Sequence, residues 1–201
     1  MTKKLNLQIR QGETFQRIIR WETPPFVYKT ISAITQTAPA RLTVPTHGLT
    51  TGWRAVVVSA NGMEEINAVN TPPRENEYRQ VTVVDPNTLD FNTVNSADYT
   101  AYVDGGYLQY YTPVDLTGYT AEMDIRDKVG GTVLFTLSTG TDARIVIDPS
   151  AKTITMNVSA ADTTLITWTR GVYDLEMYAP SGATTTIFSG NVSVVKQVTT
   201  T

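Results

Sequence analysis

Apolar and polar residues alternate in several short segments of the chain. The first segment is Leu5-Asn6-Leu7-Gln8-Ile9, in which the apolar residues fall at every second position. A period of two places the apolar side chains on one face of a strand and the polar side chains on the other. The same alternation recurs at residues 121–126, 154–158 and 173–177. These segments predict half-buried β-strands.

The N-terminal segment predicts a β-hairpin. A turn at residues 11–13 follows the first strand, and a second strand would run through Phe15, Ile18, Ile19 and Trp21. We expect Pro24-Pro25 to end this strand, because proline has no N–H to donate to a strand ladder.

The C-terminal part, from Val114 onward, predicts about five strands and one helical turn. The turn would begin at Ser159-Ala160-Ala161-Asp162, which has the spacing of a capping box. Five strands are fewer than the seven or so of an immunoglobulin-like sandwich. We therefore assign the N-terminal hairpin to the same domain, which makes the sandwich discontinuous, with residues 1–30 and 113–201. The alternative is three consecutive small units, with the hairpin as an exposed arm.

The middle segment, residues 31–112, has strand patterns of its own, at residues 40–44, 54–59, 80–84 and 89–91. Turn sequences separate them, and the segment predicts a small β-barrel inserted into the sandwich. The overall prediction is an all-β protein.

One of these turns is Thr46-His47-Gly48-Leu49, which contains the only histidine of the chain. We interpret His47 as a structural residue whose ring hydrogen-bonds neighbouring backbone. Gly48 would take a positive φ and Leu49 would anchor the turn in the core. The alternative is a lone ligand or base, but no partner constellation accompanies the histidine.

The composition narrows the chemistry. The 201 residues include 41% hydrophobic and 17% charged residues, a net charge of −3 and no cysteine. Disulfides, cysteine nucleophiles and multi-histidine metal cages are therefore excluded. We expect no cofactor or metal, no membrane association and no specific nucleic-acid binding, because the chain is acidic and no apolar run reaches the roughly 20 residues of a membrane helix.

Tyrosines are concentrated in one part of the chain. Six of the ten lie between residues 99 and 119. Tyrosine is enriched at interfaces because it combines a large rigid ring with a polar tip. The cluster is compatible with a subunit contact, a junction between the two domains or a glycan-stacking face. As the candidate protein-contact surface we select Tyr99, Tyr102, Tyr107, Tyr110 and Tyr111.

Pairs of acidic residues can serve as glycosidase carboxylates or as metal ligands. The candidates are Glu64-Glu65, Glu75 with Glu77, Asp124 with Asp127, and Asp174 with Glu176. Asp174 and Glu176 share one face of a predicted strand, with Asp124 possible on the strand beside it. We interpret them as a solvent-facing polar row and predict no catalytic residues.

The middle segment resembles a known small domain. The string Leu42-Thr43-Val44-Pro45-Thr46-His47-Gly48-Leu49, followed by Asn61-Gly62-Met63-Glu64-Glu65-Ile66-Asn67 and Asp104-Gly105-Gly106, is similar to the β-barrel known as the first catalytic cysteine half-domain of ubiquitin-activating enzymes. The chain has no cysteine for that chemistry, so only the fold carries over. Domains of this pattern also occur in structural proteins of tailed bacteriophages.

The flanking parts resemble a second phage pattern. The residues are Asp115-Leu116-Thr117-Gly118-Tyr119-Thr120-Ala121, Gly171-Val172-Tyr173-Asp174-Leu175-Glu176 and Ser189-Gly190-Asn191-Val192-Ser193-Val194. They are similar to immunoglobulin-like domains of tail, baseplate and fibre-attachment proteins.

Together the resemblances imply a non-enzymatic virion structural protein, made in the host cytoplasm and placed in the tail or neck. The implied partners are other virion proteins, with a symmetric homo-oligomer in the particle. The alternatives are a capsid decoration protein and a host-glycan-binding adhesin.

Overall fold

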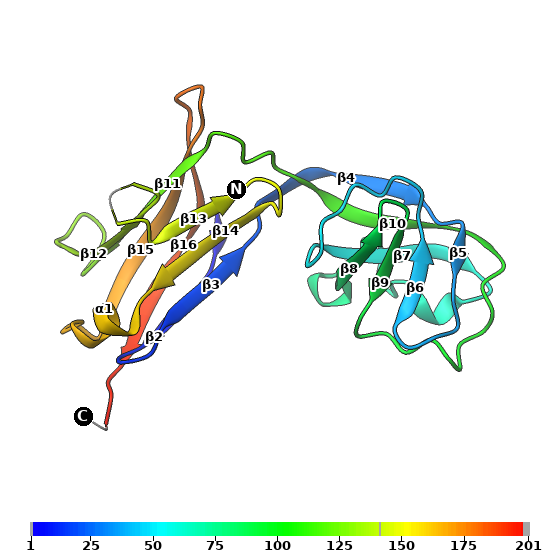
Figure 1. Ribbon diagram of the computed structural model, residues 1–201, viewed down its shortest axis with the longest axis horizontal. Coiled ribbons are helices and arrows are strands. Elements are labelled where there is room, and N and C mark those ends of the chain that lie inside the picture. The colour runs from blue at the N-terminus through cyan, green and yellow to red at the C-terminus, as the bar shows by residue number, and fades with distance from the viewer. Residues whose placement is uncertain (1, 141, 199–201) are drawn as a thin grey trace. The chain divides into compact units, whose positions relative to one another are not determined.

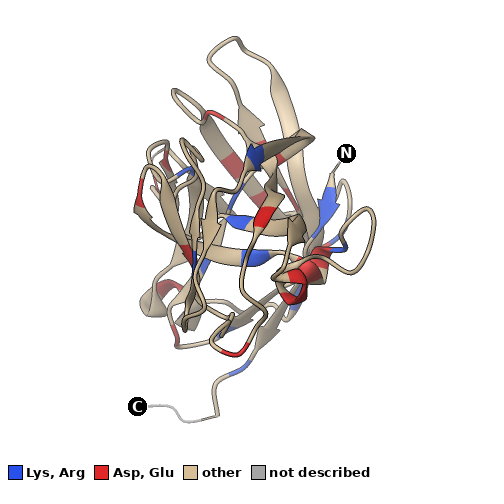
Figure 2. Ribbon diagram, turned by 90° about the vertical axis from the view of Figure 1, so that its right-hand side faces the viewer, with Lys and Arg blue, Asp and Glu red and all other residues tan. Residues whose placement is uncertain are grey.

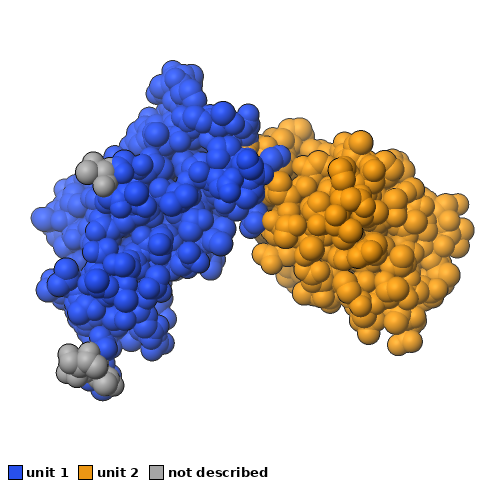
Figure 3. All heavy atoms as spheres, in the orientation of Figure 1, with its two compact units in different colours: residues 1–21, 115–201 blue, residues 22–114 orange. Residues whose placement is uncertain are grey.

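The protein consists of two β units. The computed structural model describes residues 2–140 and 142–198, and most of them lie in strands (Figure 1). Contacts divide the chain into unit 1, Met1–Trp21 with Asp115–Thr201, and unit 2, Glu22–Val114 (Figure 3). The predicted all-β fold is confirmed. No helix in the described part of the chain is long and apolar enough to cross a membrane.

Unit 1 is a sandwich of two sheets. In the first, strands follow the order β1-β16-β15-β11-β12, and β2 also pairs with β16; the second has the order β13-β14-β3. Their bounds are β1 Lys3–Lys4, β2 Leu7–Arg10, β3 Phe15–Ile19, β11 Thr120–Arg126, β12 Val133–Ser138, β13 Ile145–Asp148, β14 Thr153–Val158, β15 Arg170–Tyr178 and β16 Thr184–Val195.

The strand order is that of an immunoglobulin-like sandwich. In such a domain strands G, F, C and C′ form one sheet, while strand B pairs with E in the other. Here β16, β15, β11 and β12 occupy the first set of positions, and β3 pairs with β14 in the second sheet. Strands β3 and β11 are then B and C. Unit 2 is therefore an insertion in the connection between the B and C strands.

The predicted N-terminal hairpin is wrong. Strand β2 lies parallel to β16, whereas β3 lies antiparallel to β14 in the other sheet. The turn at residues 11–13 thus carries the chain from one sheet to the other. Leu7 and Ile9 of β2 and Ile19 of β3 still lie in the core, whereas Ile18 of β3 is 51% exposed. Alternation identified the buried face of β2 but not its neighbour.

The predicted helical turn is present as α1, Ala160–Thr164. The Asp162 N–H donates to the Ser159 hydroxyl at 3.1 Å, which is the N-cap half of a capping box. The Asp162 carboxylate forms an ion pair with Arg144 at 3.3 Å.

Unit 2, predicted as a small barrel, is a seven-stranded sheet with the order β4-β10-β7-β8-β9-β6-β5, and its end strands β4 and β5 do not pair with each other in the described residues. It surrounds a single core that includes Leu42, Trp53, Phe91 and Leu108. The bounds are β4 Glu22–Thr30, β5 Ala33–Ile34, β6 Ala40–Thr43, β7 Arg54–Asn61, β8 Arg79–Asp85, β9 Thr88–Phe91 and β10 Asp104–Pro113, with short 3₁₀ turns η1 Glu64–Ile66 and η2 Glu75–Glu77.

The N-terminal boundary of the insertion lies earlier than predicted. Residues 22–30 form β4, which pairs antiparallel with β10, so they belong to unit 2 and not to the sandwich. Pro24-Pro25 does not end the strand. The register passes from Thr23 directly to Phe26 across the bulge that holds the two prolines. This is permitted because β4 is an edge strand, where a missing N–H costs no ladder bond on the open side.

Candidate functional site

Aromatic side chains cover the outer face of the sheet formed by β4 and β10. Along β10, Leu108 and Tyr110 are buried in the core of unit 2, so Tyr107, Gln109 and Tyr111 lie on the opposite face. The register places Phe26 opposite Tyr111 and Tyr28 opposite Gln109. Tyr78, which follows η2, reaches the same face. We call this surface the aromatic face; its members are Phe26, Tyr28, Tyr78, Tyr107 and Tyr111.

The five rings form one continuous chain of contacts. Tyr107 and Tyr28 are 6.3 Å apart between ring centroids, with their planes at 89°. Tyr28 contacts Phe26 at 6.4 Å, and Phe26 contacts Tyr111 at 4.5 Å. Tyr78 stacks on Tyr111 at 6.1 Å. Edge-to-face and offset contacts of this kind stabilise the rings against one another. The outer members remain open to solvent, with Tyr28 54% and Tyr107 46% exposed.

A polar amide lies beneath the rings. Gln109 is only 2% exposed, and its Nε2 donates to the Tyr78 hydroxyl at 3.0 Å. Burial raises the pKa of Tyr78 to about 12, although this hydrogen bond opposes the shift. The Tyr78 ring is therefore fixed at its hydroxyl as well as at its faces.

Arg54 fixes one end of the aromatic face. Its guanidinium lies over the rings of Tyr78 and Tyr111, at 5.4 and 5.9 Å from their centroids. It also pairs with the carboxylates of Glu22 and Glu75. Burial lowers the pKa of Arg54, but the hydrogen bonds and charges of the two carboxylates outweigh this, and the net pKa is raised. Arginine stacked on aromatic rings and held by two acids is a rigid arrangement.

The structure divides the predicted tyrosine surface. Tyr107 and Tyr111 lie on the aromatic face, but Tyr110 is buried at 4% exposure, so its selection as a contact residue was wrong. Adjacent strand residues point to opposite faces, and Tyr110 takes the core side. Tyr99 and Tyr102 pack against the core from outside, and the Tyr102 hydroxyl donates to the Ile31 carbonyl at 3.0 Å.

Three members of the aromatic face were missed by sequence reasoning, namely Phe26, Tyr28 and Tyr78. Phe26 and Tyr28 carry an alternation signal in Phe26-Val27-Tyr28, but the prolines before them argued against a strand. Tyr78 is a single residue after a 3₁₀ turn, and nothing in its local pattern marks it.

The His47 turn is held by backbone contacts. The His47 Nδ1 accepts from the Leu49 N–H at 3.1 Å, so Nε2 carries the proton and donates to the Asp85 carbonyl at 2.9 Å. The buried Tyr110 hydroxyl donates to the His47 carbonyl at 2.5 Å. Gly48 has φ of +68° and Leu49 is 6% exposed. Both ring nitrogens of His47 are thus engaged with backbone.

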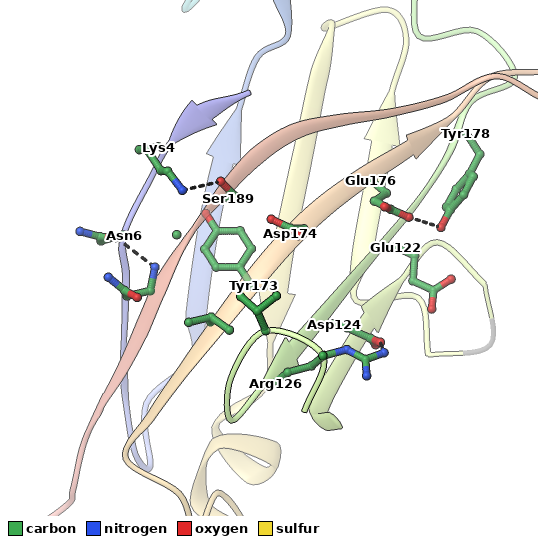
Figure 4. Close-up of a pocket in the computed structure, with 15 residues that line it drawn as sticks. Lys4, Asn6, Glu122, Asp124, Arg126, Tyr173, Asp174, Glu176, Tyr178 and Ser189 are labelled. Atoms are coloured by element: carbon green, nitrogen blue, oxygen red, sulfur yellow. Dashed lines mark hydrogen bonds and ion pairs between the residues drawn. The ribbon is translucent and has the colours of Figure 1, made fainter. Parts of the chain in front are cut away.

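Unit 1 carries an acidic outer sheet face. Glu122 lies opposite Glu176, and Asp124 lies opposite Asp174, across the β11–β15 pair. These four residues, which we call the acidic row, line a groove of about 610 Å³ together with Lys4, Arg126 and Tyr178 (Figure 4). Asp174 and Glu176 are predicted to share one face with Asp124 beside them, and this placement is confirmed.

Two members of the acidic row, Asp124 and Glu176, accept hydrogen bonds from neighbouring side chains. Asp124 accepts from Arg126 at 2.6 Å and from the Thr136 hydroxyl at 2.7 Å. Glu176 accepts from the Tyr178 hydroxyl at 2.8 Å, and this bond raises the pKa of Tyr178 to about 12. No group of three or more acidic or histidine side chains in the described residues is arranged to hold a metal ion.

The other acidic candidates have local roles. Glu77 accepts from the Arg74, Val69 and Asn70 N–H groups at 2.6, 2.6 and 3.1 Å. Glu65 accepts from the Thr100 N–H and hydroxyl, both at 2.9 Å. These backbone hydrogen bonds lower the pKa of both carboxylates. Such acids stabilise loops, and the aromatic face stays the strongest candidate site.

Acidic and basic positions are interspersed along the ribbon (Figure 2). The sequence of each unit contains residues of both signs. The distinctive feature of the surface is therefore its aromatic content on unit 2. No protein-family model matches the chain, and no curated protein matches it.

Proposed function

We propose that this chain is a non-enzymatic structural component of a tailed-bacteriophage virion, acting at the tail or neck or at the attachment of tail fibres. The observation that carries the proposal is the aromatic face on the inserted unit. The aromatic face combines tyrosines with a stacked arginine, and tyrosine and arginine are among the residues that contribute most binding energy at protein interfaces. Protein contact is the function that this surface serves best.

The domain architecture supports the same proposal. The sandwich carries an inserted second unit between its B and C strands, and both parts have the sequence likeness to phage structural domains described above. An insertion gives one chain two separate folded surfaces, which suits a protein that joins two different neighbours. The proposed partners are other virion proteins, and the chain would occur in several symmetric copies.

The test is to locate the chain in a density map of the intact virion and to fractionate particles into heads and tails. We expect the chain in the tail or neck fraction, with the aromatic face covered by another protein subunit. Recovery only on the outside of preassembled heads would instead indicate a decoration protein. Binding of the purified chain to intact host cells would indicate an adhesin, and either result would overturn the proposal.

A further inference from the structure

Strand β4 has an open edge with free backbone groups. It is the terminal strand of the unit 2 sheet, and among the strands of the described residues it pairs only with β10. The Ile31 N–H donates to the Gly106 carbonyl at 3.2 Å, which makes Ile31 and Gly106 a hydrogen-bonded pair of the antiparallel ladder. Hydrogen-bonded pairs alternate along such a ladder, so Val27 and Lys29 also direct their N–H and C=O groups toward β10.

The residues between them direct their backbone groups away from β10. These are Phe26, Tyr28 and Thr30, and no described residue hydrogen-bonds to their N–H or C=O groups. Free N–H and C=O groups along an edge are a template for another strand. These three residues are every second residue of the strand, so their side chains lie on one face of the sheet. Two of them, Phe26 and Tyr28, belong to the aromatic face.

We infer that this edge pairs with the same edge of a second copy of the chain, in an antiparallel arrangement centred on Tyr28. Tyr28 then lies opposite Tyr28 of the second copy, and Phe26 lies opposite Thr30 at both ends. Each of these three residue pairs forms two hydrogen bonds, six in all. The arrangement is two-fold symmetric and uses every free backbone group between Phe26 and Thr30.

The two neighbouring registers, centred on Lys29 and on Val27, are less favourable. Centring the pair on Lys29 sets two lysines directly opposite each other, which is destabilising. Centring it on Val27 leaves the outward groups of Thr30 opposite the bulge, where Pro24 has no N–H to donate. In the Tyr28-centred register Lys29 faces Val27, so no like charges are opposed. The self-complementarity of one register favours a second copy over an unrelated strand.

The pairing also extends the aromatic face. Tyr28 of each copy lies beside Tyr28 of the other, and the two rows of rings become one surface across the dimer. A five-residue strand pair is a small interface, and small interfaces are weak when isolated. We therefore expect a concentration-dependent dimer in solution, stabilised in an assembly that holds two copies side by side.

Disulfide trapping tests the register directly, because the chain has no cysteine of its own. Residues opposite each other in a hydrogen-bonded antiparallel pair have Cα atoms about 5.5 Å apart, within disulfide reach. In the Tyr28-centred register the two Lys29 Cα atoms are about 8 Å apart, which is beyond it. We expect Tyr28→Cys to form disulfide dimers at least about tenfold faster than Lys29→Cys.

A second arm keeps the Tyr28 ring in place. A mixture of Phe26→Cys and Thr30→Cys variants should give a disulfide between the two species. Val146→Cys is the matched control, because Val146 is 54% exposed on β13, an edge strand of the sandwich. We expect it to crosslink as slowly as Lys29→Cys.

Thr30→Pro removes one outward N–H without removing a bond to β10 or an aromatic ring. In the Tyr28→Cys background it should slow disulfide formation by about tenfold, since proline donates nothing to the partner strand. The melting curve of the variant shows whether the fold is kept. If it is not, the two cysteine crosslinking experiments above test the pairing without this variant.

Equal crosslinking at positions 28, 29 and 146 would overturn the pairing, as would capture of the edge by a strand of a different protein with no preference among the cysteine variants. None of these measurements uses the virion. A negative result would therefore overturn the self-pairing alone and leave the virion proposal to its own test.

Discussion

The acidic row of unit 1 and the aromatic face of unit 2 both lie on the outer faces of antiparallel strand pairs, β11–β15 and β4–β10, built by the same alternation. Along β11, Met123 lies in the core between Glu122 and Asp124; along β10, Leu108 lies in the core beside Tyr107 and Gln109. The inner faces are equivalent, and the outer faces differ in chemistry. The outer face of unit 1 carries carboxylates, which water solvates well, and two of them, Asp124 and Glu176, accept hydrogen bonds from neighbouring side chains. The outer face of unit 2 exposes aromatic rings, which water solvates poorly. This difference is the reason why we propose that another molecule covers the aromatic face.

The largest expected effect tests the equivalence of the inner faces. Leu108→Ala and Met123→Ala should each lower the free energy of unfolding by about 2–5 kcal/mol, because both side chains are fully buried and each substitution leaves a cavity. Hydrogen exchange with mass spectrometry reports each unit separately. We expect each variant to lose protection mainly in its own unit. Equal loss in both units for either variant would show that the two cores do not behave as separate structures.

The second prediction concerns the outer faces, where we expect substitutions to change binding in the particle by a smaller free energy than the core substitutions change stability. Tyr107→Ala should reduce incorporation of the chain into particles by about 30-fold, the equivalent of a 2 kcal/mol interface residue. Glu122→Ala, the matched change on the acidic row, should alter incorporation less than about twofold. Both variants should melt close to the parent, because neither side chain is buried. If Glu122→Ala impairs incorporation as strongly as Tyr107→Ala, the two faces are not distinguished as we propose.

The strands were predictable from sequence, and their neighbours were not. Alternation at Ala121, Met123 and Ile125 was sufficient to identify β11, because a period of two has a direct cause in strand geometry. It contains no information about which strand lies alongside. The N-terminal strands were therefore paired with each other, while in the structure β2 and β3 lie in different sheets.

Predicting the aromatic face requires knowing which alternate residues of β10 point outward, and the tyrosines themselves do not reveal this. Tyr110 and Tyr111 are adjacent and must point to opposite faces, but tyrosine occurs both in cores and on surfaces. Leu108 is the residue that decides this, because a leucine at 0% exposure places Tyr110 on its side. Pro24-Pro25 was misread for a related reason. Proline excludes a central strand, yet it is tolerated in an edge strand, and edge position is a tertiary property.

Alkaline pH should affect both units through buried tyrosines. Tyr173 in unit 1 donates to the Leu5 carbonyl at 2.7 Å, and burial raises its pKa to about 12. Burial also raises the pKa of Tyr110 in unit 2. A folded pKa above the unfolded value of about 10 means that the stabilisation is complete below pH 10 and is lost as the pH rises through the folded pKa, which is about 12 for Tyr173.

Tyr173→Phe and Tyr110→Phe should each cost about 1 kcal/mol at neutral pH, the contribution of one hydrogen bond, and should reduce the alkaline loss of stability. Unfolding free energies measured from pH 7 to 12, with tyrosinate absorbance followed in parallel, check this. A variant with the same alkaline loss as the parent would show that the substituted tyrosine is not responsible.

The smallest expected effect concerns like charges within the acidic row. Asp124 and Asp174 lie directly opposite each other, and like charges in that position destabilise a strand pair. Asp124 is already held by Arg126 and Thr136, so Asp174 is the residue to neutralise. Asp174→Asn should raise the free energy of unfolding by about 0.2–0.5 kcal/mol at low salt. The gain should diminish in 1 M salt, where the screening length is about 3 Å. Asp98→Asn makes the same charge change on an exposed residue of unit 2 and should have no measurable effect. If Asp174→Asn instead destabilises the protein at low salt, then Asp174 accepts a stabilising contact, and the acidic row is not the self-contained, solvated face with which we compare the aromatic one.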